Sequence, residues 1–327
     1  MELDYNVVFF YRNHKVGYSI KKVSDTLASG LVSITKREVP SERATFNGVI
    51  SNLLYVYKNR SNKGINHITG DIHYCILSLI GTKSVLTVHD TSAYDMSCNH
   101  LKRFLIKYLW FVVPLLLAGK IVCISAHTAQ SLKRFTKRKD IIVIGNAIDK
   151  CHKYVPKKFN KAMPVILMIG TTWNKNICTM LKSLETIKCK IVIIGRLTTE
   201  MTNLINNLKL SVENKQDLTD DEIVNEYSKC DIVAFCSLYE GFGMPIIEGN
   251  MTGRPVITSN IEPLKEIGGD AVLYADPQDF RSIRRAFEKI ICEEGLYDEL
   301  VNKGLRNVRR FTLDNIVKEY KQVYESL

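Results

Sequence analysis

Nine short apolar runs, rich in Val and Ile, recur along the 327-residue chain and constrain its fold more than any other feature. They are continuous rather than alternating, which is typical of parallel strands buried on both faces of a sheet. Helical patterns at 176–188 and 220–229 fall between them, and Thr219 followed by Glu222 predicts a capping box at the second helix. The alternation predicts an α/β protein with too many strands for one domain. The runs are 5–10, 84–88, 120–124, 141–144, 164–169, 190–194, 231–235, 255–258 and 271–274.

One polar, Lys-rich segment at 152–164 divides the chain into halves of similar size. Each half carries its own strand and helix pattern, so each is expected to form a doubly wound parallel sheet. We therefore expect an N-terminal domain at 1–155 and a C-terminal domain at 156–310. The tail, 311–327, has an amphipathic pattern and is predicted to form a helix that packs back on the N-terminal domain.

The bulk composition narrows the class of protein without naming a ligand. The formal net charge is +11, which suits nucleic acid, an anionic membrane surface or polyanionic small molecules. No nucleic-acid-binding motif accompanies the charge, so no nucleic-acid partner is expected. Nine scattered cysteines without a Cys-x-x-Cys pair indicate reduced thiols of a cytosolic protein rather than a disulfide frame or a metal site. The acidic start is unlike a signal peptide.

The segment from 231 to 258 reads as a strand, a glycine turn, a helix and a second strand. In such units ligands bind at the carboxyl ends of the strands, and the helix N-terminus favours anionic groups. Glu240 and Glu248 stand on either side of the Gly-Phe-Gly turn. Two carboxylates at such a place predict an active site. For Glu240 the alternative is a carboxylate that only stabilises the helix dipole.

An ordered series of segments in the second half resembles the donor domain of retaining GT-B glycosyltransferases, in the sucrose-synthase-like Glu-x7-Glu (group 1) family. This resemblance implies two Rossmann-like domains facing a central cleft, and a retaining hexosyltransferase that needs neither a metal nor another cofactor. Such an enzyme moves a sugar from a nucleotide-diphosphate donor to a hydroxyl of a glycan or lipid-linked acceptor, here in synthesis of a surface polysaccharide such as lipopolysaccharide. The matching segments are 169–177, 193–196, 218–227, 237–248, 253–256 and 266–277.

The resemblance assigns roles on the donor side. Glu248 is expected to bind the ribose hydroxyls, and Glu240 to act at the reacting centre beside the sugar. Lys175 fits the family's phosphate-binding lysine, whereas the family's arginine is replaced by Thr171. Arg196 is the candidate for the missing charge, with a solvated loop arginine as the alternative. Backbone amides of the glycine turns are expected to face the sugar and diphosphate, at Gly170, Gly241, Phe242, Gly243 and Met244.

The first half matches the family less specifically. Gly17 stands where the family has a glycine loop after its first strand. His89 and Asp90 match a His-Asp pair at a strand end. We expect His89 to act at the catalytic centre, against donor sugar or acceptor, with Asp90 and His73 on the acceptor side; a core histidine and a helix N-cap are the alternatives. All seven histidines lie at or before position 152, so any imidazole of the site is expected from the first half.

A helix at 101–110 carries Lys102, Arg103 and Lys107 beside large apolar side chains, and 133–139 adds further basic residues. Such a helix either rests on an anionic bilayer or is an ordinary surface helix with solvated charges. The apolar run at 108–119 contains Pro114 and is shorter than the ~20 residues of a membrane span, so it is expected to be a buried or interfacial helix. We expect a cytoplasmic protein that associates peripherally with the inner face of the cytoplasmic membrane.

Other functions remain open on the sequence alone. A nucleotide-sugar epimerase or hydrolase would use the same donor site without an acceptor. A non-enzymatic polyanion-binding protein would use the positive charge, and an inactive partner subunit would explain the missing arginine. For a transferase, retention proceeds either by attack on the face that the diphosphate leaves or through a covalent intermediate on Glu240.

Overall fold

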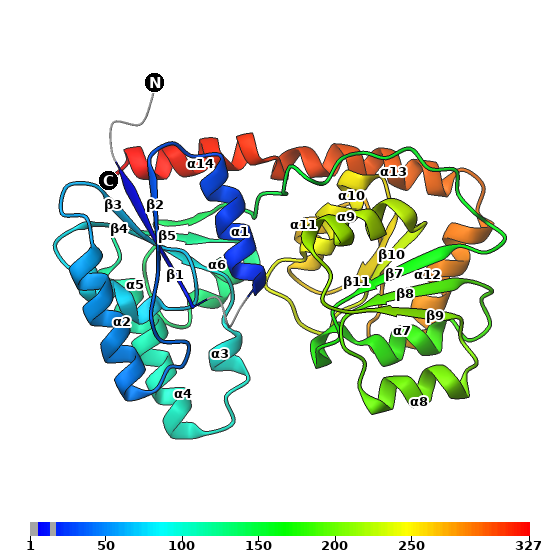
Figure 1. Ribbon diagram of the computed structural model, residues 1–327, viewed down its shortest axis with the longest axis horizontal. Helices are drawn as coiled ribbons and strands as arrows, with labels where there is room; N and C mark the ends of the chain where they lie inside the picture. The colour runs from blue at the N-terminus through cyan, green and yellow to red at the C-terminus, as the bar shows by residue number, and fades with distance from the viewer. Residues whose placement is uncertain (1–5, 14–17) are drawn as a thin grey trace. The chain divides into compact units, whose positions relative to one another are not determined.

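The computed structural model describes residues 6–13 and 18–327. The chain forms two compact units, each built on a six-stranded parallel sheet flanked by helices (Figure 1). Unit 1 comprises residues 1–147 together with 312–327, and unit 2 comprises residues 148–311. The predicted α/β class with two Rossmann-like sheets is confirmed.

The sheet of unit 1 has the strand order β2-β1-β3-β4-β5-β6. β1 lies between two parallel neighbours, so that Val7 is opposite Ile34 on one side and Ile65 on the other. The side chains of β1, β4 and β5 are almost wholly buried, as expected for strands covered on both faces. The strands are β1 (Val7–Tyr11), β2 (Ile34–Glu38), β3 (Ile65–Ile68), β4 (Lys83–Val88), β5 (Lys120–Cys123) and β6 (Ile141–Val143).

Helices cover the two faces of this sheet separately. One face packs against α1 and the C-terminal helix α14, through residues such as Leu27 and Ile316. The other face packs against the segments from α2 to α6, through residues such as Val56 and Phe111. The helices are α1 (Tyr18–Ser29), α2 (Phe46–Asn59), η1 (His73–Leu79), α3 (Ser92–Asp95), α4 (His100–Ile106), η2 (Lys107–Val112), α5 (Val113–Leu117), α6 (Ala126–Leu132) and α14 (Leu313–Glu325).

Unit 2 repeats the design with the strand order β12-β11-β10-β7-β8-β9. Its apolar cluster joins alternate residues of the central strands, such as Met168 and Ile193, to residues of α7 and α12, such as Met180 and Phe287. The strands are β7 (Val165–Ile169), β8 (Lys190–Ile194), β9 (Val212–Lys215), β10 (Ile232–Phe235), β11 (Val256–Ser259) and β12 (Leu273–Ala275).

The helices of unit 2 confirm the expected capping box, because the Thr219 side chain accepts from the Glu222 amide and the Glu222 carboxylate accepts from the Thr219 amide. The helix predicted at 176–188 is shorter than expected and ends at Ser183. The helices are η3 (Trp173–Lys175), α7 (Ile177–Ser183), α8 (Thr199–Asn207), α9 (Asp220–Lys229), α10 (Met244–Thr252), α11 (Leu264–Gly268), α12 (Phe280–Cys292), α13 (Leu296–Asn307) and η4 (Val308–Phe311).

Candidate functional site

Three adjacent strands of unit 2 end at the same edge of its sheet, and each is followed by a glycine turn. β10, β7 and β8 are parallel neighbours. Gly170, Gly195 and Gly243 have φ values of +81°, +134° and +112°, which favour glycine. A Cβ on Gly195 would lie 2.8 Å from Thr171 Oγ1, so the turns after β7 and β8 are in contact. Open α/β sheets bind ligands at such an edge.

The turn after β7 is fastened to the turn after β10. Asn176 adopts a left-handed conformation with φ of 58°, and its side-chain amide donates to the carbonyl of Cys236 at 3.0 Å. In return, the amide of Leu238 donates to the carbonyl of Asn174 at 2.8 Å. These bonds fix the position of Lys175, which stands between the two asparagines.

Lys175 and Glu240, two of the predicted donor-side residues, form an ion pair at this edge. Lys175 Nζ lies 2.7 Å from Glu240 Oε1 and 4.8 Å from the centre of the Phe235 ring. The Asn174 side-chain amide lies 3.5 Å from the same carboxylate oxygen. Both charged side chains are largely buried, with 22% and 12% exposed. Removal of one partner would leave the other charge poorly solvated.

Glu248, on α10, is held by a buried phenol. The Tyr227 hydroxyl donates to Glu248 Oε2, and burial, together with the nearby Glu248 charge, raises the pKa of Tyr227 well above its usual value. Tyr227 therefore remains a donor. His152 Nε2 lies 3.9 Å from Glu248 Oε1, and the His152 ring meets the Tyr227 ring edge-on, with centroids 5.3 Å apart. The Glu248 side chain is 14% exposed, so its oriented carboxylate still reaches solvent.

His152 lies in the segment that the sequence assigned to the N-terminal domain at 1–155, but the structure places it in unit 2, which begins at Ile148. Its imidazole lies beside Glu248. Nothing in the local sequence around His152 signals this contact. Tyr227 had a weak signal, since it ends the family-like segment 218–227.

The turn between Glu240 and Glu248 leads directly into α10. Gly243 is the N-cap of this helix, and Met244 is its first residue. Phe242 is buried, and its ring packs edge-on against Phe311 with centroids 5.6 Å apart. The aromatic side chain thus anchors the turn, while Gly241 and Met244 remain partly exposed. The start of α10 is therefore available to a ligand at the same edge as Lys175.

Arg196 follows Gly195 directly after β8 and is exposed. Within the described residues its guanidinium forms no hydrogen bond or ion pair. Its backbone neighbour Gly195 touches Thr171, the residue that replaces the family's arginine. The geometry is compatible with both expectations for Arg196, a solvated loop arginine and a replacement charge.

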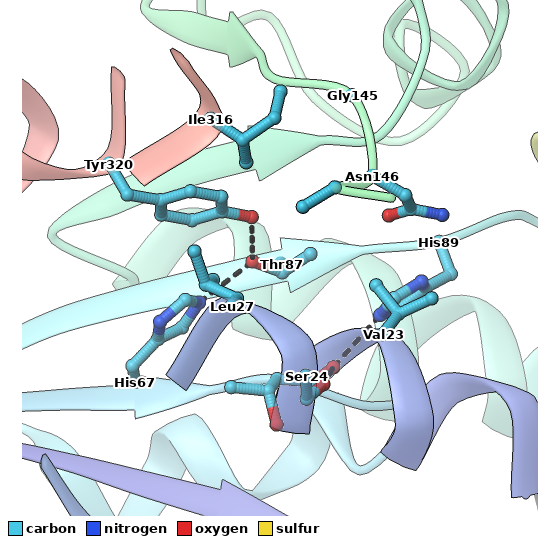
Figure 2. Close-up of a pocket in the computed structure, with 12 residues that line it drawn as sticks. Val23, Ser24, Leu27, His67, Thr87, His89, Gly145, Asn146, Ile316 and Tyr320 are labelled. Atoms are coloured by element: carbon cyan, nitrogen blue, oxygen red, sulfur yellow. Dashed lines mark hydrogen bonds between the residues drawn. The ribbon is translucent and has the colours of Figure 1, made fainter. Parts of the chain in front are cut away.

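In unit 1, His89 follows β4 and is buried. Its Nε2 lies 2.8 Å from the carbonyl oxygen of Thr69, so Nε2 carries the proton and Nδ1 is an acceptor. Burial is the largest influence on the pKa of His89 and lowers it, which favours the neutral imidazole. His89 lines a small cavity of about 20 Å³ together with His67 and Tyr320 (Figure 2). Such a volume suits about one water molecule.

The other predicted residues of unit 1 are engaged in different ways. His73 Nδ1 lies 2.8 Å from the carbonyl oxygen of Trp110, and burial lowers the pKa of His73. Its Nε2 is buried without a hydrogen-bond partner among the described residues. Asp90 accepts from the Ser92 amide at 2.7 Å and from the Ser92 hydroxyl, so it stabilises the start of α3. Gly17 lies outside the described residues.

Comparison with known proteins decides the family of unit 2. The family model described as "Glycosyl transferases group 1" matches residues 152–306, which include the turns described above. Unit 2 is a group 1 glycosyltransferase domain. The match begins at His152 and contains Lys175, Glu240 and Glu248.

Two curated relatives illustrate how much of the chain is aligned in each case. The chain is 37% identical over 98 residues to the serotype-specific mannosyltransferase WbdA of Escherichia coli, a stretch that covers 30% of this chain and only 12% of WbdA. It is 26% identical over 294 residues to the uncharacterized glycosyltransferase MJ1178 of Methanocaldococcus jannaschii, which covers 85% of this chain and 81% of that protein.

Comparison with solved structures covers both units, not only the group 1 domain. The crystal structure of Anabaena Alr3699/HepE in complex with UDP and glucose is similar, with a TM-score of 0.79 and 14% sequence identity, over 99% of this chain and 100% of that one. The two parallel-sheet units therefore form a GT-B fold.

Proposed function

We propose that this chain is a retaining, metal-independent glycosyltransferase that moves a sugar from a nucleotide-diphosphate donor to a hydroxyl of a glycan or lipid-linked acceptor. The observation that carries the proposal is the Lys175–Glu240 pair, 2.7 Å apart, between the glycine turns of a group 1 domain. A departing diphosphate needs positive charge and oriented amides, and this edge of the sheet offers both. The product would belong to a surface polysaccharide.

The same edge has a place for each part of the donor. Glu248 would accept hydrogen bonds from the ribose hydroxyls, with Tyr227 fixing the carboxylate. The amides at Gly170 and in 241–244 would face the diphosphate and the sugar. Lys175 and the exposed Arg196 would offset the negative charge of the leaving group. His89, with Asp90 and His73 on the acceptor side, would contribute from unit 1.

Retention fits an attack on the face that the diphosphate leaves. The acceptor oxygen bonds to the anomeric carbon, the bond between that carbon and the phosphate oxygen breaks, and the departing phosphate takes the acceptor proton. Lys175 Nζ and the Asn174 amide lie 2.7 Å and 3.5 Å from Glu240 Oε1. Donors at this oxygen make the carboxylate a weaker nucleophile, so we assign Glu240 to orienting the sugar rather than to a covalent intermediate.

The comparisons suggest which donors to try first. WbdA is a mannosyltransferase by name, and the HepE structure contains UDP and glucose. We therefore place nucleotide-activated mannose and UDP-glucose at the head of a panel of donors. A ligand that binds only the folded state raises the melting temperature, so thermal stabilisation identifies the donor without an acceptor.

Replacement of Lys175 by alanine tests the proposal, with Lys182→Ala as the matched control. Lys182 is an exposed lysine on the adjacent helix α7. With the donor from the panel, we expect Lys175→Ala to lower kcat/KM about 100-fold or more, and Lys182→Ala to stay within about twofold. Release of nucleoside diphosphate and formation of glycan product are measured together. Full activity and full donor stabilisation in Lys175→Ala would refute the assignment.

A further inference from the structure

Two long segments of unit 1 contain no acidic residue. Residues 96–139 include nine Lys and Arg and no Asp or Glu, and residues 43–70 include four Lys and Arg and no Asp or Glu. Together they contain α2, α4, η2, α5 and α6. A surface formed by these segments attracts anions, since no carboxylate within them offsets the positive charge.

α2 carries an apolar stripe that faces solvent. Phe46, Ile50, Leu54 and Tyr57 recur at intervals of three and four residues, so they share one side of the helix. Phe46 is 81% exposed and Leu54 is 55% exposed. The core-facing side of the same helix is supplied by other residues, such as Val56. The exposed stripe is therefore separate from the buried side chains through which α2 packs on the core.

A second exposed apolar stripe lies on α4 and the π-helical segment η2. Leu101, Phe104, Leu105 and Tyr108 again follow helical spacing, and Leu101 and Phe104 are 71% and 58% exposed. Leu116 on α5 is exposed as well. This segment continues the apolar run predicted to be a buried or interfacial helix, and its surface residues are not buried by the chain itself.

Both stripes belong to the same side of the sheet. α2, η1, α4, η2 and α5 all contribute to the apolar cluster on one face, opposite α1 and α14 (Figure 1). Tyr74 of η1 joins them, because its hydroxyl accepts from Asn52 of α2 at 2.8 Å and its ring lies 4.8 Å from that of Trp110 in η2. The helices that carry the two stripes are thus joined through Tyr74.

Free positive charges accompany the stripes. Lys102 is exposed on α4, and Lys133, Lys137 and Lys139 are exposed after α6. Arg103 is not one of these free charges, since its guanidinium stacks 4.4 Å from the centre of the Tyr94 ring. Arg134 is bound to Asp95 at 2.7 Å. Lys102 therefore supplies an exposed positive charge within the stripe of α4, and long lysine side chains reach from an apolar contact to a polar boundary.

We propose that the face formed by α2, α4, η2 and α5 docks on an anionic lipid bilayer. Exposed Phe, Leu and Ile would enter the boundary between headgroups and acyl chains, and the lysines would contact lipid phosphates. Two segments that carry positive charges and no carboxylate are complementary to an anionic bilayer, which is the occupant we assign to this face. Among the described residues no helix is long and apolar enough to cross a membrane, so the contact would be peripheral.

This inference rests on the proposed function in one respect. A lipid-linked acceptor is found in a bilayer, so the bilayer would be a partner of the proposed transferase. Binding is nevertheless measured without donor or acceptor. Failure to bind lipid would leave donor binding and transfer in solution untouched, and failure of transfer would leave lipid binding untouched. The two proposals can therefore fail separately.

The test is co-sedimentation of the full chain with vesicles of phosphatidylcholine alone and with vesicles that also contain the anionic lipid phosphatidylglycerol. We expect binding to the anionic vesicles, weakened by salt, and at least tenfold weaker binding to neutral vesicles. The double variants Phe46→Ser/Leu54→Ser and Leu101→Ser/Phe104→Ser should each reduce binding at least tenfold, and Lys102→Glu should reduce it severalfold.

Matched controls lie on unit 1 outside the face. Val32→Ser changes an exposed apolar residue between α1 and β2, and Lys318→Glu changes an exposed lysine of α14 on the opposite side of the sheet. Both should bind like the original chain, and circular dichroism checks that every variant folds. Equal binding to neutral and anionic vesicles, or no binding to either, would overturn the proposal. So would self-association of the original chain that the serine variants abolish, since that outcome assigns the face to a second copy.

Discussion

Glu248 owes its orientation to a phenol that is fully buried. Tyr227 is inaccessible to solvent, yet its hydroxyl donates to the Glu248 carboxylate, the group proposed to bind the ribose. The Glu248 side chain is partly exposed, so its charge is partly desolvated and gains from this neighbouring donor. At the residue scale, the proposed ribose contact is therefore a pair of residues rather than a single carboxylate.

Tyr227→Phe removes only the hydroxyl of that pair. Loss of a hydrogen bond to a charged group is worth about 1.5–3 kcal/mol, so we expect the KM for the donor to rise roughly tenfold or more while kcat changes much less. Tyr297→Phe is the control, because the Tyr297 hydroxyl is buried without a hydrogen-bond partner among the described residues. Steady-state kinetics with a saturating acceptor measure both. Equal KM values for the two variants would contradict the role assigned to Tyr227.

Sequence could identify individual residues of the site better than the contacts between them. Lys175 and Glu240 were predicted separately, from two motifs 65 positions apart, and the structure brings them to 2.7 Å. The contact with His152 could not be predicted, because it depends on how the chain enters unit 2 before β7. Asn176 was not predicted either, since its role rests on a left-handed backbone that the sequence does not specify.

At the scale of elements, α10 can approach the sheet only because of a glycine. A Cβ on Gly249 would lie 2.8 Å from Val256 Cγ2 and 3.2 Å from Val233 Cγ2. Both valines belong to buried central strands, so neither can move away freely. The same helix carries Glu248 and begins at the glycine turn, so its distance from the sheet sets the position of the candidate site.

Gly249→Ala should therefore destabilise unit 2 by about 1–3 kcal/mol, the usual cost of overpacking a core. The matched control is Gly70→Ala, where the added Cβ would find its nearest neighbour, Ile20 Cγ2, at an ordinary 3.6 Å. That variant should stay within about 0.5 kcal/mol. Urea unfolding followed by circular dichroism compares the two. If Gly249→Ala were as stable as the control, the close packing of α10 would be of no energetic importance.

The three strands that the sequence did not predict all lack a continuous apolar run. β2 and β9 are edge strands, exposed on one side, and their sequences ITKRE and VENK lack a continuous apolar run. β3 is a central strand, but Asn66 and His67 interrupt its apolar pattern. Both side chains are buried and hydrogen-bonded, with Asn66 donating to the Ser61 carbonyl at 2.8 Å. Apolar periodicity finds strands with two buried apolar faces, and it misses those whose buried positions are polar.

At the scale of the whole molecule, unit 1 is closed by the far end of the chain. α14 returns to the unit after all of unit 2, and its Tyr324 hydroxyl lies 2.8 Å from His67 Nδ1. His67 Nε2 lies 2.7 Å from the Thr87 hydroxyl, which is 3.3 Å from the Tyr320 hydroxyl (Figure 2). The imidazole thus links β3 and β4 to α14 across 257 residues of sequence.

The buried imidazole makes the stability of unit 1 depend on acidity. Burial lowers the pKa of His67 to about 3, from an ordinary value of 6.5. Between these two values the unfolded chain binds a proton that the folded chain does not, so stability rises with pH in this window. The contribution is fully present above pH 6.5 and is lost as pH falls toward 3, by about 1.4 kcal/mol for each pH unit. His73 and His89, whose pKa values burial also lowers, act in the same direction.

His67→Gln keeps hydrogen-bonding groups but cannot titrate. The free energy of unfolding of unit 1 should therefore depend less steeply on pH. Between pH 6 and 4 we expect the slope to be smaller than that of the original chain by about 1.4 kcal/mol per pH unit. The chain has two tryptophans, Trp110 in unit 1 and Trp173 in unit 2. A Trp173→Phe background therefore lets Trp110 fluorescence follow urea unfolding of unit 1 alone. His100→Gln, at an exposed position, should keep the original slope. An unchanged slope in His67→Gln would show that the imidazole linking α14 to the sheet does not exclude its proton.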